Sequence, residues 1–182
     1  AAISYLRSHF RIPFVGMEPA VKPAALASRT GVVGVLATAN TFKGRLYRDT
    51  VMRYASGIRI VEVVGKGLVE AVERGDVPEE LIRSYVGQMT GEGADVIVLG
   101  CTHFPFLEKE IAAAAGPSVR IINPAPAVAR QTRRVVENLP HGISGCGRRE
   151  FHTTGDPACL IRTVLSIDPS LTPDHFHRTN IQ

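Results

Sequence analysis

The sequence predicts an α/β fold with one open, largely parallel sheet flanked by helices. Strands that alternate with helices along the chain favour parallel pairing. A chain of 182 residues, 45% of them hydrophobic and 21% charged, can bury one sizeable core or two small ones. Two apolar runs, residues 32–37 and 96–99, are typical of strands that are buried on both faces. Residues 58–64 and 119–122 are predicted as two further strands.

The chain before the first buried strand is predicted to contain a helix, a short strand and a connection. Residues 1–10 carry apolar side chains on one side of a helix, and residues 12–16 are interpreted as a short strand. Residues 18–25 contain two prolines and are expected to lead into a short helix. A turn at residues 30–31 then precedes the first buried strand.

The strand at residues 96–99 is expected to lie in the middle of the sheet, because all four of its residues are apolar. Gly100 ends this strand, and Pro105 suits the first turn of a helix that continues to Ile111. Four further helices are predicted around the sheet: residues 42–54, 66–74, 78–92 and 123–139.

The composition changes after Pro140. Residues 141–147 are predicted as a loop, residues 150–154 as a strand and residues 158–166 as a helix. Residues 168–182 are polar, and we expect them to be loose.

Polar side chains follow two buried strands at their carboxyl ends, which is the edge where open α/β sheets bind ligands. Cys101, Thr102 and His103 follow the central strand, and Thr38 and Thr41 follow the first one. The start of a helix favours a thiolate, and a histidine two residues away could exchange protons with a reacting group. The alternatives are a small buried cysteine beside a helix-capping histidine, and a threonine that only caps its helix.

Composition argues against several classes of partner. No apolar run approaches the roughly 20 residues of a membrane span, and the N-terminus lacks the pattern of a signal peptide. Three widely spaced cysteines argue against a disulfide framework and indicate a reducing compartment, the cytoplasm. The net charge of +4 comes from scattered basic residues, so neither a nucleic acid nor a membrane is expected as a partner.

No metal or cofactor site is predicted. Cys146, His152 and Cys159 lack the spacing of metal ligands. The chain has no glycine-rich phosphate loop and no dinucleotide fingerprint. Its four lysines lie in no pocket-forming context, so a Schiff-base cofactor has no anchor.

Several segments, in order over about residues 1–160, resemble the glutamate racemases. The most specific is Gly100-Cys101-Thr102-His103-Phe104-Pro105, which is similar to the second catalytic segment of that family. Other segments are similar to further stretches of the same family: residues 15–20, residues 34–41 followed by Tyr47, residues 67–73, 123–129 and 151–156.

The resemblance implies a cofactor-independent enzyme that interconverts L- and D-glutamate, with two cysteines as bases on opposite faces of Cα. Cys101 matches the second of these cysteines, and His103 matches its partner. Glu73 matches an acidic position whose role the resemblance leaves open. The family's product, D-glutamate, enters bacterial peptidoglycan. Three residues match those that hold the carboxylates and the amine of the substrate: Thr38, Thr41 and Thr102.

The same resemblance predicts one intact racemase domain and parts of another. Residues 19–139 match the intact domain, whereas residues 1–18 and 140–182 match pieces of the family's first domain. The Cys-Asn-Thr and Asp-Ser-Gly segments of that first domain have no counterpart in residues 1–182. We therefore expect this chain alone to lack one base and not to racemise glutamate at a useful rate.

The segments that match the first domain carry apolar side chains, but the sheet against which that domain packs them is not in residues 1–182. We therefore expect a homo-oligomer, a rearranged packing or disorder in these segments. The side chains are Ile3, Leu6, Phe10, Phe14, Phe151, Leu160, Ile161 and Val164.

Two other functions remain open. One is a racemase of the same group that acts on aspartate, hydantoin or a related acid. The other is a non-catalytic α/β module that binds an acidic amino acid or a protein partner.

Overall fold

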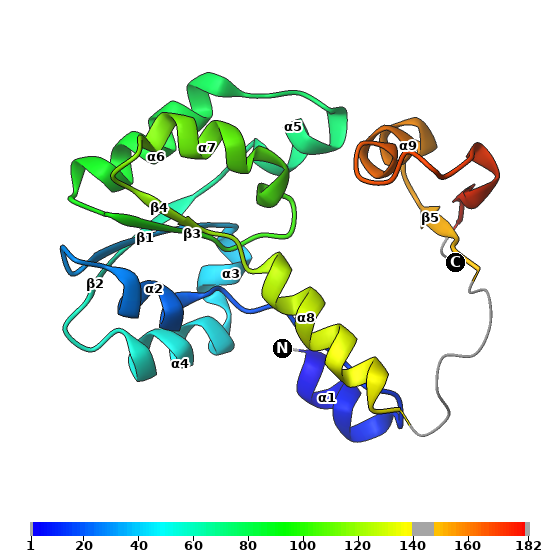
Figure 1. The fold of residues 1–182 in the computed structure, drawn as a ribbon, viewed down its shortest axis with the longest axis horizontal. Helices are drawn as coiled ribbons and strands as arrows, with labels where there is room; N and C mark the ends of the chain where they lie inside the picture. The colour runs from blue at the N-terminus through cyan, green and yellow to red at the C-terminus, as the bar shows by residue number, and fades with distance from the viewer. Residues whose placement is uncertain (1, 140–147, 181–182) are drawn as a thin grey trace.

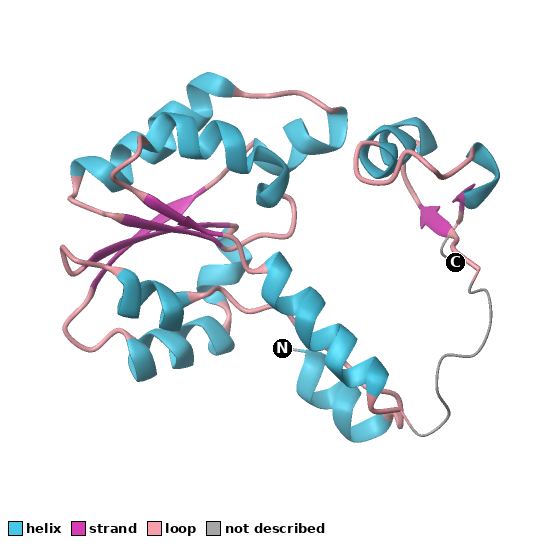
Figure 2. Cartoon of the chain, viewed as in Figure 1, coloured by secondary structure: helices cyan, strands magenta, loops and turns pink. Residues whose placement is uncertain are grey.

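A four-stranded parallel sheet forms the centre of the molecule, as the computed structural model shows for residues 2–139 and 148–180. The strand order is β2-β1-β3-β4, so β3 is an inner strand, between β1 and β4 (Figures 1 and 2). The predicted fold class is therefore confirmed. The strands are β1 (Val32–Ala37), β2 (Arg59–Val64), β3 (Val96–Leu99) and β4 (Arg120–Ile122).

Helices cover both faces of this sheet (Figure 1). On one face the helices are α5 (Leu68–Arg74), α6 (Glu79–Gly91) and α7 (Glu108–Ala115). On the other face they are α2 (Val21–Ala27) and α4 (Arg45–Tyr54).

The two faces of the sheet carry separate hydrophobic cores. Successive side chains of a strand point to opposite faces, so Ile97 and Leu99 of β3 join the core under α5, α6 and α7. Val96 and Val98 join the core under α2 and α4. All four residues are at most 1% exposed. Burial on both faces explains why this strand is apolar throughout.

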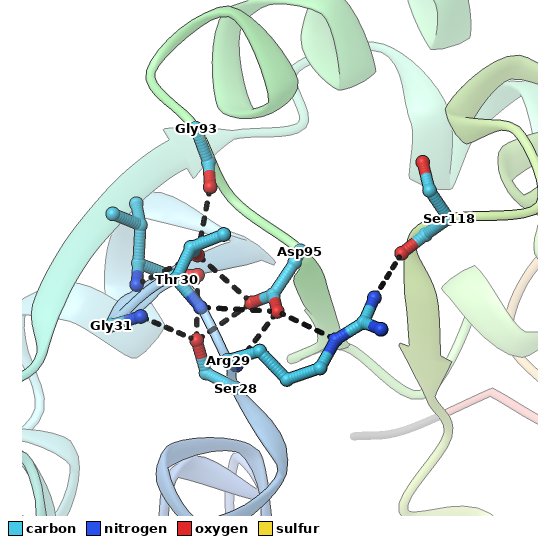
Figure 3. Close-up of polar contacts among 8 residues, drawn as sticks. Ser28, Arg29, Thr30, Gly31, Gly93, Asp95 and Ser118 are labelled. Carbon is cyan, nitrogen blue, oxygen red and sulfur yellow. Dashed lines mark hydrogen bonds and ion pairs between the residues drawn. The ribbon is translucent and has the colours of Figure 1, made fainter.

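The amino end of β3 is fixed by Asp95, which lies at the edge of the sheet opposite to the strand tips (Figure 3). Its carboxylate accepts hydrogen bonds from the Ser28 hydroxyl at 2.6 Å and the Arg29 backbone N–H at 2.7 Å. It also accepts from the hydroxyl and the backbone N–H of Thr30, at 3.0 and 3.3 Å. Burial raises the pKa of Asp95, but these four hydrogen bonds outweigh burial and lower it to about 2.

Several predicted helices end or divide at different residues in the structure. Gly44 separates α3 (Ala39–Lys43) from α4, where one helix over residues 42–54 was predicted. The segment after β3 begins as a 3₁₀ helix, η1 (Phe104–Leu107), and becomes α-helical only in α7. The helix predicted over residues 123–139 is α8 (Ala125–Glu137).

The N-terminal segment departs from the prediction at one point. Residues 2–9 form helix α1 (Ala2–His9) as expected, but residues 12–16 do not form a strand. The Phe14 carbonyl accepts hydrogen bonds from the Arg7 guanidinium, at 2.9 and 3.2 Å. A strand needs a neighbouring strand for its backbone, and a side chain takes that place here.

The C-terminal tail was expected to be loose, and this expectation is wrong for its described part. Residues 148–180, which we call the C-terminal unit, contain β5 (Phe151–Thr153), α9 (Pro157–Leu165), η2 (Pro173–His175) and β6 (Phe176–Arg178). Strand β6 pairs with β5 in parallel, and the Phe176 and Phe151 rings stack at 5.2 Å. Phe176 is 9% exposed and Leu171 is 6% exposed. Burial of Phe176 and Leu171 therefore orders a segment whose sequence is mostly polar.

The apolar side chains that were expected to lack a partner are mostly half-buried. Of the eight, Phe10 is exposed, and none of the others belongs to the buried core of the described residues. Association through these side chains remains a prediction. Cys146 and the predicted loop at residues 141–147 lie outside the described residues.

No helix within residues 2–139 and 148–180 is long and apolar enough to cross a membrane.

Candidate functional site

The tips of β1 and β3 lie close together at the carboxyl edge of the sheet. The Gly100 N–H donates to the Leu36 carbonyl at 2.7 Å, which continues the pairing of the two strands by one residue. A Cβ at Gly100 would lie 2.8 Å from the Ala37 Cβ, so glycine is required for this close approach. Thr38 and Cys101 are consequently the next residues on two neighbouring strands.

Cys101 contacts a histidine that in turn contacts a carboxylate. The Cys101 Sγ lies 4.0 Å from the His103 Nδ1, the upper limit for a hydrogen bond to sulfur. The His103 Nε2 lies 3.4 Å from a carboxylate oxygen of Glu73 on α5. The thiol is buried, whereas the Glu73 side chain is 63% exposed. The imidazole thus links a buried thiol to a carboxylate at the surface.

The His103 ring has one further neighbour. The Thr102 hydroxyl lies 3.4 Å from the same Nδ1 that faces Cys101. Thr102 is exposed and His103 is half-buried. The helical segment predicted after Cys101 is present: it begins as the 3₁₀ helix Phe104–Leu107, for which His103 is the N-cap residue, and becomes α-helical at Glu108. The thiol therefore lies before the start of a helical segment and beside the His103 side chain.

Thr38 and Thr41 form a pair at the tip of β1. Their hydroxyl oxygens lie 3.0 Å apart, and both residues are half-buried. Thr41 lies inside α3 and does not cap it, so the interpretation that Thr41 only caps a helix is wrong. Within the described residues, no hydrogen bond joins this pair to Cys101 or His103.

A cavity of about 700 Å³ lies between this edge of the sheet domain and the C-terminal unit. Thr102, His103 and Glu73 line one side of it. The opposite side is formed by the turn at residues 153–156 and by Cys159 of α9. The side chains of Cys101, Thr38 and Thr41 are not among those that line it. The structure thus divides the predicted site residues between the cavity wall and the adjacent strand tips.

The residues on the C-terminal side of this cavity were missed by sequence reasoning. The Thr-Thr-Gly-Asp segment at residues 153–156 was predicted as the end of a strand and a turn, and it resembles a family segment, but neither it nor Cys159 was given a role in the site. Asp156 caps α9 by accepting from the Ala158 N–H at 2.9 Å, which fixes the start of the helix that carries Cys159. The cap motif was visible in the sequence, but its distance from His103 was not.

Tyr47, which belongs to a segment that resembles the family, lies outside this site. It is 3% exposed in the core under α4, and its ring packs edge-on against Phe42 at 5.2 Å. Burial, and then the nearby Glu62 carboxylate, raise the pKa of its hydroxyl. The hydroxyl has no hydrogen-bond partner of good geometry among the described residues, Glu62 included. Tyr47 is a core residue in this structure.

Comparison with known proteins identifies the family. The model of the Asp/Glu/hydantoin racemase family matches residues 1–132. Glutamate racemase from Herpetosiphon aurantiacus is 45% identical over 175 residues, which covers 92% of this chain and 69% of that protein. Glutamate racemase from Deinococcus radiodurans is 39% identical over 176 residues and is covered to 61%. The chain therefore spans about two thirds of the length of these curated relatives.

Solved structures agree with this assignment. Escherichia coli glutamate racemase, crystallised with L-glutamate and the activator UDP-MurNAc-Ala, matches with a TM-score of 0.79 and 26% identity, over 97% of this chain and 67% of that one. The isoform RacE1 from Bacillus anthracis shares the fold, with a TM-score of 0.77 and 20% identity, over 100% of this chain and 69% of that one. The chain belongs to the Asp/Glu/hydantoin racemase family, and within that family to the glutamate racemases.

Proposed function

We propose that this protein works in the interconversion of L- and D-glutamate without a cofactor, and that Cys101 is the base on one face of the substrate. The observation that carries the proposal is the contact series from Cys101 through His103 to Glu73 at the carboxyl edge of the sheet. The 45% identity to a glutamate racemase supports glutamate as the proposed substrate.

The proposed reaction is a proton transfer at Cα. The Cys101 thiolate takes the α-proton, the C–H electron pair moves into the substrate's carboxylate as an enediolate, and the thiol S–H is formed. Return of a proton to the opposite face gives the other enantiomer. The group that returns it is a second thiol, which family resemblance places in a Cys-Asn-Thr segment that residues 1–182 do not contain.

His103 and Glu73 support this transfer in the proposal. The imidazole stands beside the thiol and can accept a proton from it, and the Glu73 carboxylate on the far side of the ring stabilises the imidazolium that results. This arrangement places a proton acceptor beside the thiol and a carboxylate beside that acceptor.

Three threonines hold the substrate in the proposal. Thr102 borders the cavity beside His103, while Thr38 and Thr41 present paired hydroxyls at the neighbouring strand tip. Hydroxyl groups both donate to carboxylate oxygens and accept from an amine, as a dicarboxylic amino acid requires. We expect the product D-glutamate to enter peptidoglycan, as the resemblance implies.

Solvent exchange tests the base directly. The purified 182-residue chain is incubated with each glutamate enantiomer in D₂O, and loss of the α-proton is followed by NMR while optical rotation or circular dichroism follows inversion. We expect deuterium to enter one enantiomer only, with no inversion, because one face has a base and the other does not.

Two variants make this test specific. Cys101→Ala removes the base and should abolish exchange, whereas Cys146→Ala removes a thiol to which the resemblance gives no role and should leave exchange unchanged. Exchange that survives in Cys101→Ala refutes the assignment of the base. Full inversion by the unaltered chain refutes the expectation that it lacks one base.

Two alternatives are decided by related measurements. The matching family model also covers racemases of aspartate and hydantoin, so exchange is measured with those substrates as well. A non-catalytic module that binds an acidic amino acid would give heat on titration with glutamate but no exchange.

The expected homo-oligomer is tested by light scattering coupled to gel filtration.

A further inference from the structure

Arg162 of α9 links the C-terminal unit to the helix that carries Glu73. Its Nη2 donates to the Arg74 backbone carbonyl at 3.3 Å, and α9 packs against α5. Its Nε lies over Gly75, 3.7 Å from where a Cβ would stand. The guanidinium therefore covers the carboxyl end of α5, one residue after Glu73.

Helix α5 closes on Gly75, whose N–H donates to the Val72 carbonyl, and Arg162 donates to the Arg74 carbonyl beside it. The helix has seven residues between two glycines with positive φ, Gly67 at 83° and Gly75 at 79°, and so short a helix is marginal by itself. Its inner side is held in the core by buried apolar residues, but Glu73 projects from the exposed side. The last carbonyl groups of a helix have no partner within the helix, and Arg162 donates to one of them.

The charge of Arg162 is also directed at this helix end. No carboxylate forms an ion pair with Arg162 in the part of the chain that the structure describes. The neighbouring Arg74 is already paired with Asp76 at 2.8 Å. The carboxyl end of a helix carries partial negative charge, so a cation at that position is favourable. The guanidinium can therefore donate a hydrogen bond to the Arg74 carbonyl and also interact favourably with the negative end of the α5 dipole.

Arg162 is itself held in place by its own helix. Its Nη2 also contacts the Cys159 Sγ at 3.3 Å, and Asp156, Cys159 and Arg162 follow one another at spacings of three along α9. Asp156 and Cys159 line the large cavity, and Arg162 lines a smaller one of about 300 Å³ beside it. Of these three side chains, Arg162 is the one that contacts the end of α5.

We propose that Arg162 is a positioning residue: it holds the carboxyl end of α5 so that the Glu73 carboxylate stays against His103. Through this contact the C-terminal unit controls the imidazole that faces Cys101. The importance of this contact for turnover rests on the proposed function, but the contact itself can be tested without any turnover.

The test reads the His103 side chain in the full chain by NMR. Proteins with ¹³C-labelled histidine are compared at one pH, and the His103 Cε1–H signal is assigned with His103→Gln. Glu73→Gln defines the signal of an imidazole without its carboxylate. We expect Arg162→Ala to move the signal in the same direction by at least half as much, and Arg162→Lys, which keeps a cationic donor, to restore most of the original position.

Two further variants separate positioning from general stability. Arg149→Ala breaks an ion pair with Asp168 inside the C-terminal unit and touches neither α5 nor His103, so it should leave the His103 signal unchanged even where it lowers the melting temperature. In a Glu73→Gln background, Arg162→Ala should add no further shift, because the two act in one series.

The proposal is overturned if Arg162→Ala melts earlier while the His103 signal stays in place, or if its shift persists in full in the Glu73→Gln background. Should Arg162→Ala fail to fold, Arg162→Gln replaces it, since it keeps a donor and removes the charge. Failure of the proposed function is a separate result: no variant, nor the unaltered chain, would then exchange the α-proton of glutamate, whatever the NMR signal shows.

Discussion

Replacing Asp95 by asparagine is expected to destabilise the sheet domain. The carboxylate is 9% exposed and accepts four hydrogen bonds from the segment between α2 and β1 (Figure 3). Asparagine has one acceptor oxygen, and its NH₂ group takes the place of the other carboxylate oxygen. Two of the four donors therefore lose the oxygen that accepts from them.

The magnitude follows from the pKa of this group. Lowering the pKa from 3.8 to about 2 corresponds to about 2 kcal/mol of stability at neutral pH. The ion pair with Arg29 adds little, because that side chain is 79% exposed and its Nε lies 3.7 Å away. We therefore expect Asp95→Asn to lose about 2 to 3 kcal/mol, with the unpaired donors adding to the loss.

The sign of the pH dependence is fixed by the same shift. Because the folded-state pKa lies below the unfolded one, the contribution is complete above about pH 5 and declines as the pH falls through the folded value. At pH 3 about half of it remains. The difference in unfolding free energy between the unaltered chain and Asp95→Asn should therefore shrink by about 1 kcal/mol between pH 7 and pH 3.

Urea unfolding followed by circular dichroism measures both quantities. Asp49→Asn is the matched control, since Asp49 forms an exposed pair with Arg45 within one helix and should change stability by less than about 0.5 kcal/mol. An Asp95→Asn chain as stable as this control, or a difference that is the same at pH 7 and pH 3, would refute the reasoning.

Three other substitutions test the packing around the site. Gly100→Ala places a Cβ 2.8 Å from a neighbouring Cβ, so its unfolding free energy in urea should fall by about 1 to 3 kcal/mol. The control Gly87→Ala meets open space on a helix and should be neutral or stabilising, and equal effects of the two would contradict the close approach of the strand tips. Phe176→Ala should increase amide exchange throughout the C-terminal unit, and the exposed Ile167→Ala should not; a unit that stays protected in Phe176→Ala would show that this ring does not order it. Tyr47→Phe removes a buried hydroxyl that has no hydrogen-bond partner among the described residues, so it should keep or raise the melting temperature. A large drop would reveal a hydrogen bond at this position.

The sheet could be predicted because its signal is local. The apolar run of β3 requires burial on both faces, and the register that results places Thr38 beside Cys101 at the strand tips. The formation of strand β6 could not be predicted in this way. Its residues are Phe176, His177 and Arg178, and only the pairing with β5 and the stacking on Phe151 make them a strand. Tertiary contacts override local composition there.

The site could be predicted only in part, for a related reason. Cys101 and His103 are two residues apart, so their proximity follows from the chain itself. Glu73 is thirty residues away on another helix, and only the family resemblance indicated it before the structure brought it to 3.4 Å from His103. Nothing in the sequence indicated that Cys159 borders the same cavity.

The site and the fold draw on different residues, and this separation has a physical basis. The free energy that holds β3 in place comes from fully buried side chains and from the Asp95 cluster at the opposite edge. The contact between His103 and Glu73 joins side chains that are 33% and 63% exposed, and such a pair contributes little to stability. The buried core does not fix the geometry of the contact between His103 and Glu73. The elements that pack against α5 must therefore hold the Glu73 side chain in place. Besides the 3₁₀ helix η1, the element that packs against α5 is α9 of the C-terminal unit, with Arg162 at the point of contact.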